Sequence, residues 1–372
     1  MTQREREILN WIAENPMISQ QELAEKAGIT RSSVAVHISN LMKKGCIVGR
    51  GYIVHTAPYA VVVGGVNMDI GGRPARALVP QDSNPGQVRM SLGGVGRNIA
   101  HNMALLGVDV RLLTAFGDDL YAQKLAASCG ELGIDISQAL QVPGAATSTY
   151  LFIADERGDM ALAVSDMEIY AHVTPAWLST RQALLDNAQL IVFDTNIPAE
   201  SVAWLAENVK VPLFADPVST AKAEKLRPVL GKLHTLKPNR LEAELLSGVA
   251  ITDEASLNRA ADVLLGTGLR RVLISLGGEG IFAADHHARC LIPCLPGRMV
   301  NTTGCGDAAM AAVAWAYLEG TDLRGTTLAA LAAGAVAMES TETINPAMSA
   351  RLLRQRAGLS LPPRGGEGRT AP

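Results

Sequence analysis

The chain has 372 residues, 48% of them hydrophobic, and its 33 basic and 36 acidic residues leave a net charge of −3 at pH 7. That length suits one large domain and a small one. No apolar run approaches the ~18 residues of a membrane span, and the charged first residues lack the apolar core of a signal peptide, which argues against a membrane-spanning or exported protein.

The five cysteines have no paired metal-binding spacing. Their odd number favours a reducing cytosol, so we expect a cytoplasmic protein. Cys290 and Cys294 flank strand-like residues and are expected to be buried thiols.

Residues 1–57 predict three helices and a hairpin. The first helix, over 5–13, has isoleucines and a leucine on one face. Ser19 begins the second with Glu22 three residues later, as in a capping box. A short turn leads into a third helix over 31–44, and 46–54 reads as a two-strand hairpin. This order resembles a winged helix-turn-helix.

In that resemblance the third helix reads DNA. Its Arg31, Ser32, Ser33 and His37 would face the DNA, together with Arg50 from the wing. Residues 1–57 hold seven basic and five acidic side chains, a weakly basic module on an acidic chain. A dimerisation or regulatory appendage that never meets DNA is the alternative. Because one small reader binds weakly, a homodimer presenting two copies is expected.

Residues 58–357 form the second predicted domain. Apolar strand-like runs alternate there with helical stretches, which indicates a mostly parallel sheet covered on both faces. The helices are expected at 120–132, 178–185, 201–209 and 255–267. The segments 70–92 and 148–164 break the alternation and read as strands. The tail from Gly358 to residue 372 has no core pattern and is expected to be disordered.

Two glycine turns that open helices are the most informative patterns. Residues 93–107 begin Gly-Gly-Val-Gly-Arg-Asn and continue with apolar residues at helical spacing, which places Asn98 in the first turn of a helix. Residues 301–307 read Asn-Thr-Thr-Gly-Cys-Gly-Asp before an alanine-rich helix. The free N–H groups of a helix start suit a phosphate, and glycine lets it approach the backbone. Taken alone, the second turn could equally be a structural turn before a core helix.

Together the two stretches resemble the paired signatures of the ribokinase-like (PfkB) family of sugar and nucleoside kinases, and the resemblance covers about residues 58–350. It implies an α/β three-layer sandwich, with 70–92 and 148–164 forming a small β lid over the substrate. It also implies phosphoryl transfer from ATP, with magnesium, to a hydroxymethyl group.

The resemblance assigns roles to particular residues. Asp307 would be the catalytic base beside an anion hole formed by Gly304, Cys305 and Gly306. The substrate would be held by Asn67, Asp69, Gly93, Gly94, Asn98 and, less securely, Asn196. The nucleotide would meet Asn239, Ser275, Gly277, Gly280 and Gly306, and Glu242 would hold magnesium through water.

Some of these residues also have a purely structural explanation. The alternative for Asp69 is an ordinary turn residue after a strand. Asn239 and Glu242 read as a helix cap and a solvated glutamate. Cys305, inside the anion hole, predicts sensitivity to alkylation.

Asn301 departs from the family pattern. Many relatives carry Asp there, and that Asp helps to hold potassium. An asparagine offers a carbonyl oxygen without charge, so a K⁺ site at Asn301 and Thr303 stays open.

Asp307 is expected to be ionised at neutral pH because an ordinary Asp has a pKa of about 3.9. It would accept the proton as phosphoryl transfer proceeds, which is worth ~10²–10⁴-fold in rate.

The winged module, with Asn67, Asp69 and Asn98, resembles the pseudouridine-kinase-like branch of the family most. That resemblance implies a nucleoside phosphorylated on its 5′-hydroxyl. Fructose or another free sugar is the alternative substrate. A transcription factor whose kinase-like domain only senses a ligand is an alternative of a different class.

Overall fold

The computed structural model describes residues 1–47, 58–157 and 159–360. The chain forms two compact units, Met1–Pro58 and Tyr59–Pro372, and each is described by itself. Among the described residues, no helix is long and apolar enough to cross a bilayer.

The N-terminal unit is a three-helix cluster with a side-chain cap at each helix start. Its helices are α1 (Gln3–Glu14), α2 (Gln20–Ala27) and α3 (Arg31–Lys43). Thr2 and Ser19 form capping boxes with Glu5 and Glu22, and the Thr30 side chain accepts from the Ser33 N–H. Apolar residues from all three helices make one core, among them Ile8, Ile12, Leu23, Val34, Ile38 and Leu41. The predicted hairpin over 46–54 lies almost wholly outside the described residues, as does Arg50.

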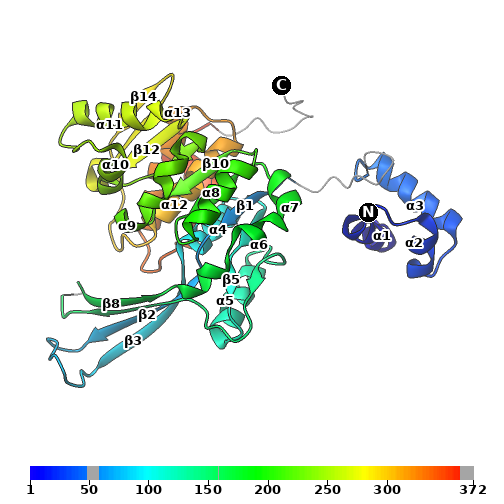
Figure 1. Cartoon of the computed structure of the whole chain (residues 1–372), viewed down its shortest axis with the longest axis horizontal. Coiled ribbons are helices and arrows are strands. Elements are labelled where there is room, and N and C mark those ends of the chain that lie inside the picture. Colours follow the sequence, from blue (N-terminus) through cyan, green and yellow to red (C-terminus); the bar gives the residue numbers. More distant parts are fainter. Residues whose placement is uncertain (48–57, 158, 361–372) are drawn as a thin grey trace. The chain divides into compact units, whose positions relative to one another are not determined.

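The larger unit is built on an eight-stranded sheet in the order β14-β13-β12-β11-β10-β9-β1-β4 (Figure 1). Six strands are parallel: β1 (Ala60–Val63), β4 (Val110–Leu113), β9 (Ile191–Asp194), β10 (Leu213–Asp216), β11 (Thr235–Leu236) and β12 (Arg271–Ser275). Two antiparallel strands close one edge: β13 (Ile281–Asp285) and β14 (Arg289–Ile292).

Helices cover both faces of this sheet, and β1 shows why. Val61 and Val63 pack into one core while Ala60 and Val62 pack into the other, because successive side chains of a strand point to opposite faces. The first core is covered by α6 (Pro175–Ser179), α7 (Gln182–Asp186), α8 (Ala199–Asn208), α9 (Thr220–Ala223), α10 (Arg240–Ser247) and α11 (Glu254–Gly266). The second is covered by α4 (Val95–Leu105), α5 (Leu120–Glu131), α12 (Cys305–Leu318) and α13 (Leu323–Ala337), with α14 (Ala350–Ala357) packed on α13.

A separate four-stranded sheet, in the order β3-β2-β7-β8, projects from the body as a lid (Figure 1). Its strands are β2 (Asn67–Pro74), β3 (Gly86–Gly93), β7 (Thr149–Ala154) and β8 (Met160–Asp166). The α/β sandwich with a small β lid and an N-terminal helical unit confirms the predicted fold class. The remaining elements are the strand pair β5 (Ala115–Phe116) and β6 (Leu140–Gln141) and the 3₁₀ helices η1 (Glu168–His172), η2 (Glu224–Lys232) and η3 (Gly277–Glu279).

Three local predictions were wrong. The helix expected at 178–185 is two short helices, because the Thr180 hydroxyl and the Arg181 guanidinium both donate to the Trp177 carbonyl and end α6 there. Cys290 is half-buried and Cys294 is exposed, so neither is a buried thiol. Gly358 is the left-handed cap of α14 and Leu359 packs on the core, so the ordered chain continues to residue 360. Residues 361–372 of the predicted tail lie outside the described part.

Candidate active site

The two glycine turns meet at one point in the structure. Gly94 caps α4 and Gly304 caps α12, and Asn98 and Asp307 lie in the first turns of these helices. The Asn98 Nδ2 amide donates to Asp307 Oδ2 at 2.8 Å. The early turn and the late turn therefore share one site.

The turn before α12 can be made only by a residue without a side chain. Gly304 has φ of 82°, and a Cβ there would lie 2.3 Å from the Thr343 carbonyl oxygen. Gly306 is exposed, with no atom nearer to its hypothetical Cβ than Lys237 Nζ at 3.7 Å. The first N–H groups of α12 thus open onto an uncrowded space beside a cation, as an anion site requires.

Asp307 is half-buried and does not have an ordinary pKa. Burial, and next the charge of Asp216, raise the pKa of Asp307 to about 7, against the opposing effects of the Asn98 hydrogen bond and the Lys237 charge. The expected pKa of about 3.9 was therefore wrong. A carboxyl group with a pKa near the working pH suits a general base that must take up and release a proton.

Lys237 is the charged centre of the site, and no role was predicted for it. Its side chain is buried, and its Nζ lies 3.2 Å from Asp216 Oδ2. Burial works against the ammonium charge, but Asp216, Glu242 and Asp307 outweigh it and raise the pKa of Lys237. Lys237 is therefore a fixed cation among three carboxylates.

A cavity of about 370 Å³ lies beside the start of α12, and no residue of the lid strands lines it. Gly306 and Cys305 line it together with Ser275, Gly277 and Gly280, which is where the sequence placed the nucleotide. Its other walls are mostly apolar side chains of α13 and of the loop before α12: Leu295, Met299, Ala330, Leu331, Ala335 and Met338. A glycine-rich rim over an apolar floor fits a nucleotide, with phosphates at the α12 turn and the base against the aliphatic wall.

Asn239 does not line this cavity. Its side chain accepts from the Glu242 N–H at 2.9 Å, and the Glu242 carboxylate accepts from the Asn239 N–H at 2.8 Å. The two residues thus form a capping box at α10. Glu242 is buried rather than solvated, and burial raises its pKa.

The carboxylates around Lys237 supply the oxygen ligands that magnesium prefers. No three Asp, Glu, His or Cys side chains in the described part of the chain come close enough to hold a metal ion directly. One oxygen of Glu242 is already bonded to the helix cap. These residues fit an ion that keeps most of its water, as was expected for Glu242.

Asp69 lies on the lid side of the site, at the start of β2. Asn67 Nδ2 donates to Asp69 Oδ1, and Gly93 leaves room for this carboxylate, since a Cβ there would lie 2.2 Å from Asp69 Oδ2. Burial raises the pKa of Asp69 to about 6, while the Asn67 bond and the Arg97 charge oppose the rise. Asp69 is therefore held in place as a half-exposed acceptor, and not as a free turn residue.

Arg97 is a buried cation that the sequence reasoning missed. Its guanidinium donates to the Leu92 carbonyl at 3.0 Å and to Ser128 Oγ at 2.9 Å. These bonds tie the end of β3 to α5, and they bring a positive charge next to Asp69.

Asn196 lies near the first glycine turn, with Gly65 between them. A Cβ at Gly94 would lie 2.4 Å from the Gly65 carbonyl oxygen, and a Cβ at Gly65 would lie 3.0 Å from Asn196 Nδ2. Lys222 Nζ donates to Asn196 Oδ1 at 2.5 Å, which fixes the orientation of the amide. Asn67, Asp69, Gly93, Gly94, Asn98 and Asn196 therefore all lie around one region, next to Asp307.

The side chain of Asn301 is hydrogen-bonded within the loop before α12. Asn301 Oδ1 accepts from the Thr303 N–H at 3.0 Å, and its Nδ2 donates to the Thr341 carbonyl at 3.4 Å. The amide closes the loop before Gly304, and a K⁺ site at Asn301 and Thr303 stays a prediction.

Cys305 lines the nucleotide cavity, as expected for a site of alkylation. Burial, with the charge of Asp307 next, raises the pKa of this thiol. Its thiolate is therefore scarce at neutral pH, and its reaction with an alkylating reagent should be slow.

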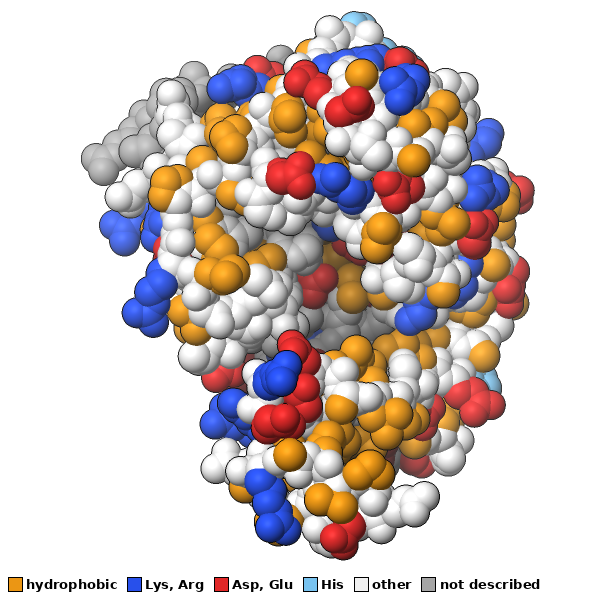
Figure 2. Space-filling model, turned by 90° about the vertical axis from the view of Figure 1, so that its left-hand side faces the viewer, with side chains coloured by type: hydrophobic (Ala, Val, Ile, Leu, Met, Phe, Trp, Pro, Cys, Tyr) orange, Lys and Arg blue, Asp and Glu red, His pale blue; other side chains and the backbone are white. Residues whose placement is uncertain are grey.

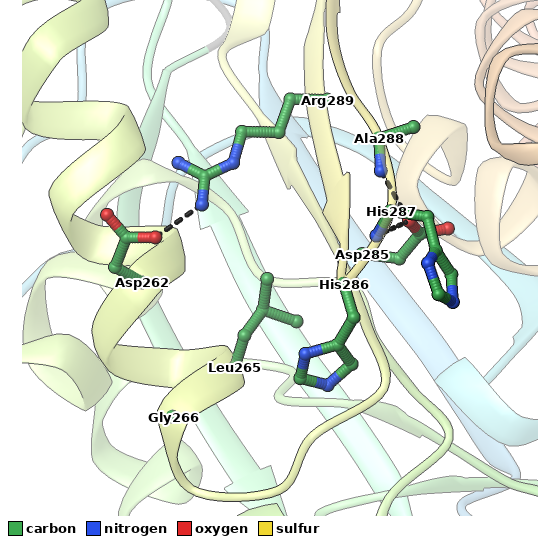
Figure 3. A pocket seen from close by; sticks show the side chains of 8 residues that line it. All are labelled: Asp262, Leu265, Gly266, Asp285, His286, His287, Ala288 and Arg289. Carbon is green, nitrogen blue, oxygen red and sulfur yellow. Dashed lines mark hydrogen bonds and ion pairs between the residues drawn. The ribbon is translucent and has the colours of Figure 1, made fainter.

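A second, open pocket of about 480 Å³ shares no lining residue with this cavity (Figure 3). It is lined by the turn between β13 and β14 and by the end of α11, and an ion pair between Arg289 and Asp262 crosses its rim. None of the predicted site residues lines it. A surface view shows instead a hollow where the lid, at the bottom, meets the α/β body, with acidic side chains inside and at the edge (Figure 2).

Within the N-terminal unit, the predicted DNA-facing residues divide into two groups. Arg31 and Ser32 are exposed on α3, whereas Ser33 and His37 are half-buried. The Ser33 hydroxyl is bonded to Thr30 in the helix cap at 2.9 Å. Val36, which was not predicted, is 59% exposed in the middle of the same helix.

Comparison with known proteins agrees with this geometry. The profile of the pfkB family of carbohydrate kinases matches residues 57–350, and that of a winged helix-turn-helix DNA-binding domain matches residues 1–48. An uncharacterised sugar kinase of Escherichia coli K12, YeiI, is 39% identical over 94% of this chain and 97% of its own. The pseudouridine kinase of the same organism is 38% identical over 78% of this chain and 94% of its own.

Solved structures share the fold. A carbohydrate kinase from Agrobacterium tumefaciens has a TM-score of 0.70 at 26% identity, covering 82% of this chain and 98% of that one. Arabidopsis thaliana ribokinase complexed with ribose and ATP has a TM-score of 0.73 at 21% identity, covering 82% of this chain and 100% of that one. The second likeness concerns the fold alone.

Proposed function

Since the chain belongs to the pfkB family of carbohydrate kinases, with a winged helix-turn-helix at its N-terminus, we propose that it transfers the γ-phosphoryl group of ATP to the primary, 5′-type hydroxyl of a nucleoside such as pseudouridine. The observation that carries the proposal is the 2.8 Å bond between Asn98 and Asp307. This bond supports the proposal because it joins the predicted base to Asn98, while the neighbouring Cys305 and Gly306 line the glycine-rich cavity.

Asp307 acts as the general base. Its Oδ2 is bonded to Asn98, which leaves Oδ1 to accept the proton of the substrate hydroxyl as phosphoryl transfer proceeds. A pKa of about 7 means that a large fraction of the group is ionised at neutral pH and that the ionised form is basic enough to accept a proton.

The phosphate side relies on charge stabilisation. The Gly306 and Asp307 N–H groups lie in the first turn of α12, where the helix offers them no acceptor, whereas the Cys305 N–H donates to the Thr302 carbonyl at 3.3 Å. Together with the Lys237 ammonium they form a preorganised positive site for the oxygens that gain charge in transfer. Bound ATP would supply the phosphoryl group and magnesium the remaining positive charge, and Glu242 and Asp216 would hold that ion through water.

On the substrate side, the side chains would act mainly as hydrogen-bond acceptors and donors. Asp69 accepts from substrate hydroxyl groups, and Asn67 and Asn98 can donate. Arg97 holds the end of β3 in place behind them. These groups position a polyol below the lid, with its primary hydroxyl toward Asp307.

Nucleoside specificity is tested by measuring ADP release with pseudouridine, uridine, ribose and fructose, with the phosphorylated product identified by mass spectrometry. Phosphorylation of pseudouridine with a kcat/KM at least tenfold above that for each free sugar supports the proposal. A preference for fructose or ribose would overturn the nucleoside assignment. No turnover at all, together with ligand-dependent DNA binding, would favour a ligand-sensing regulator instead.

We also propose that the N-terminal unit contacts DNA through α3. Arg31 and Ser32 are exposed where a recognition helix meets the major groove, and Val36 is available for a thymine methyl group. Selection of bound sequences from a random DNA pool by the full chain tests this. An Arg31→Ala protein that enriches the same sequences equally well would contradict it.

A homodimer built through the lid is the third part of the proposal. Cross-strand pairing places Ile70, Met90, Leu151 and Val164 in one row, and a second row contains Val88, Ile153 and Leu162. Because paired residues point to the same face, these form one apolar face, and Val88 is 72%, Leu162 64% and Val164 58% exposed. An apolar sheet face this exposed is typical of a surface that is covered by a partner.

A further inference from the structure

The opposite face of the lid carries two aromatic side chains beside the substrate carboxylate. Tyr150 pairs with Asp69 and Phe152 pairs with Gly71, so both rings are on the Asp69 face. The Phe152 ring lies directly over Gly71, since a Cβ there would lie 2.5 Å from its Cζ. The two ring centroids are 5.9 Å apart, and both side chains are only half-buried.

A second feature lies at the base of the same lid. Lys222 Nζ bonds Asn196 Oδ1 at 2.5 Å and lies 3.5 Å from Sδ of Met167, the residue that follows β8. The root of β8 is held by Ser148, whose hydroxyl donates to the Asp166 carbonyl. Lys222 is therefore fixed where the lid joins the body, next to the end of β8, where Asp166 pairs with Thr149, the residue before Tyr150.

The Lys222–Asn196 pair presents only donors. The lysine bond occupies the amide oxygen of Asn196, so the NH₂ end is the one directed toward Gly65. An ammonium group has three donor hydrogens, of which one is used by Asn196 and one is directed at the weak acceptor Met167 Sδ. Burial lowers the pKa of Lys222, and the charge of Asp194 opposes that change. None of the ion pairs among the described residues includes Lys222.

The loop that carries Lys222 is strained. Val218 has φ of 64°, a left-handed conformation that is unfavourable for a β-branched residue. Its N–H donates to Asp216 Oδ1 at 2.9 Å, and Ser219 then caps α9, the helix that carries Lys222. A strained backbone conformation persists where surrounding contacts stabilise it, and such conformations are found most often at functional sites.

We propose that Tyr150 and Phe152 on one side and Lys222 with Asn196 on the other form a subsite for a planar, carbonyl-bearing ring, such as the uracil ring of a pyrimidine nucleoside. This deepens the proposed function and rests on it. The aromatic pair supplies an apolar face for the ring, and base–aromatic contacts of this kind strengthen binding about tenfold or more. The two donors bind ring carbonyl oxygens. A free sugar has neither a flat face nor a carbonyl oxygen at that position.

The test is calorimetric titration of pseudouridine and of ribose, without ATP, into wild-type protein and the variants Lys222→Met and Phe152→Leu. Loss of a charge-assisted hydrogen bond predicts an affinity for pseudouridine about 10- to 100-fold lower in Lys222→Met. Phe152→Leu is expected to lose about tenfold, and ribose binding should change less than twofold in both.

Lys225→Met is the matched control. Lys225 lies one turn further along, and its Nζ bonds the Thr195 and Ile197 carbonyls at 2.7 and 2.8 Å. Lys225 is half-buried like Lys222, but its ammonium donates to backbone carbonyl groups and not to a side chain. Its loss should therefore lower the melting temperature and leave the ratio of pseudouridine to ribose affinity unchanged.

An equal loss for ribose and pseudouridine in Lys222→Met, or an unchanged affinity for pseudouridine, would overturn the subsite. Failure of wild-type protein to bind pseudouridine would overturn it as well. Tight binding of pseudouridine that depends on Lys222, without phosphorylation, would support the subsite while refuting the proposed kinase substrate.

Discussion

Asn98 and Asp307 are 209 positions apart in the chain, and their side chains are joined by a 2.8 Å hydrogen bond. Each begins a helix after a glycine turn, so two helix starts face one another across the site. The bond orients the carboxylate and leaves one of its oxygens free. An acid so placed can receive a proton only from a group that lies between the two turns.

Asp307→Asn should reduce kcat by ~10²–10⁴-fold, the usual value of a general base. The amide keeps the size of the side chain and cannot accept the proton. Affinity for ATP should stay within about threefold, because the backbone N–H groups of α12 are unchanged. Steady-state kinetics and calorimetric titration with an ATP analogue measure the two effects. Near-wild-type turnover would remove Asp307 from the base role.

The pH profile should follow the pKa of about 7 for Asp307. The base must be ionised, so log kcat/KM should rise with unit slope below pH 7 and level off above it. Burial and Asp216 place the inflection there, some three pH units above that of an ordinary Asp. The profile should be recorded with saturating magnesium at constant ionic strength. Because kcat/KM reports the pKa values of the free enzyme, an inflection near pH 4 would contradict the raised pKa of Asp307.

The same group should make the folded protein less stable as pH rises. A carboxyl whose pKa is raised on folding holds its proton in the folded state while the unfolded state releases it, so stability falls between about pH 4 and pH 7. Asp307→Asn avoids this penalty, which is of the order of 1–4 kcal/mol. The variant should therefore melt higher than wild type at pH 8, with a smaller gap at pH 5. Equal gaps at both pH values would contradict the assignment.

Some of this site could be predicted from local patterns and some could not. Asn98 and Asp307 follow from glycine turns that open apolar helices, which short stretches of sequence reveal. Lys237, Asp216 and Asp194 are strand-end residues whose meeting depends on register: Asp194 pairs directly with Asp216. Acidic residues that close apolar strands were the available signal, since the carboxyl ends of parallel strands lie at one edge.

The electrostatics could not be predicted, because they follow from that meeting. The raised pKa of Asp307 depends first on its burial and then on Asp216, neither of which its own segment reveals. Glu242 likewise read as solvated, yet the fold buries it in a capping box. Family resemblance supplied the fold class and the lid, which periodicity alone did not determine.

Leu162→Asp should convert a lid-mediated dimer to a monomer. Leu162 is 64% exposed on the apolar lid face, and a carboxylate buried there in a dimer would lack a partner. Arg157→Asp is a control, because Arg157 is an exposed residue of the turn between β7 and β8. Light scattering after size exclusion measures the mass at several concentrations. A wild-type protein that is monomeric throughout, or a dimeric Leu162→Asp protein, would rule out this interface.

Lys237→Met should have two effects: the pH profile of kcat/KM should move to higher pH, and ATP should bind more weakly. The buried ammonium lies 3.2 Å from Asp216 and holds down the pKa of Asp307, so its loss should shift the inflection of kcat/KM above 7. It also removes the cation beside Gly306, so the KM for ATP should rise at least tenfold.

Breaking a buried pair costs about 3–5 kcal/mol, so Lys237→Arg, which keeps the charge, is measured in parallel as a folded control. A Lys237→Met protein that folds and keeps both its inflection and its KM for ATP would show that Lys237 is structural, and that the phosphate oxygens are stabilised by the helix start without it.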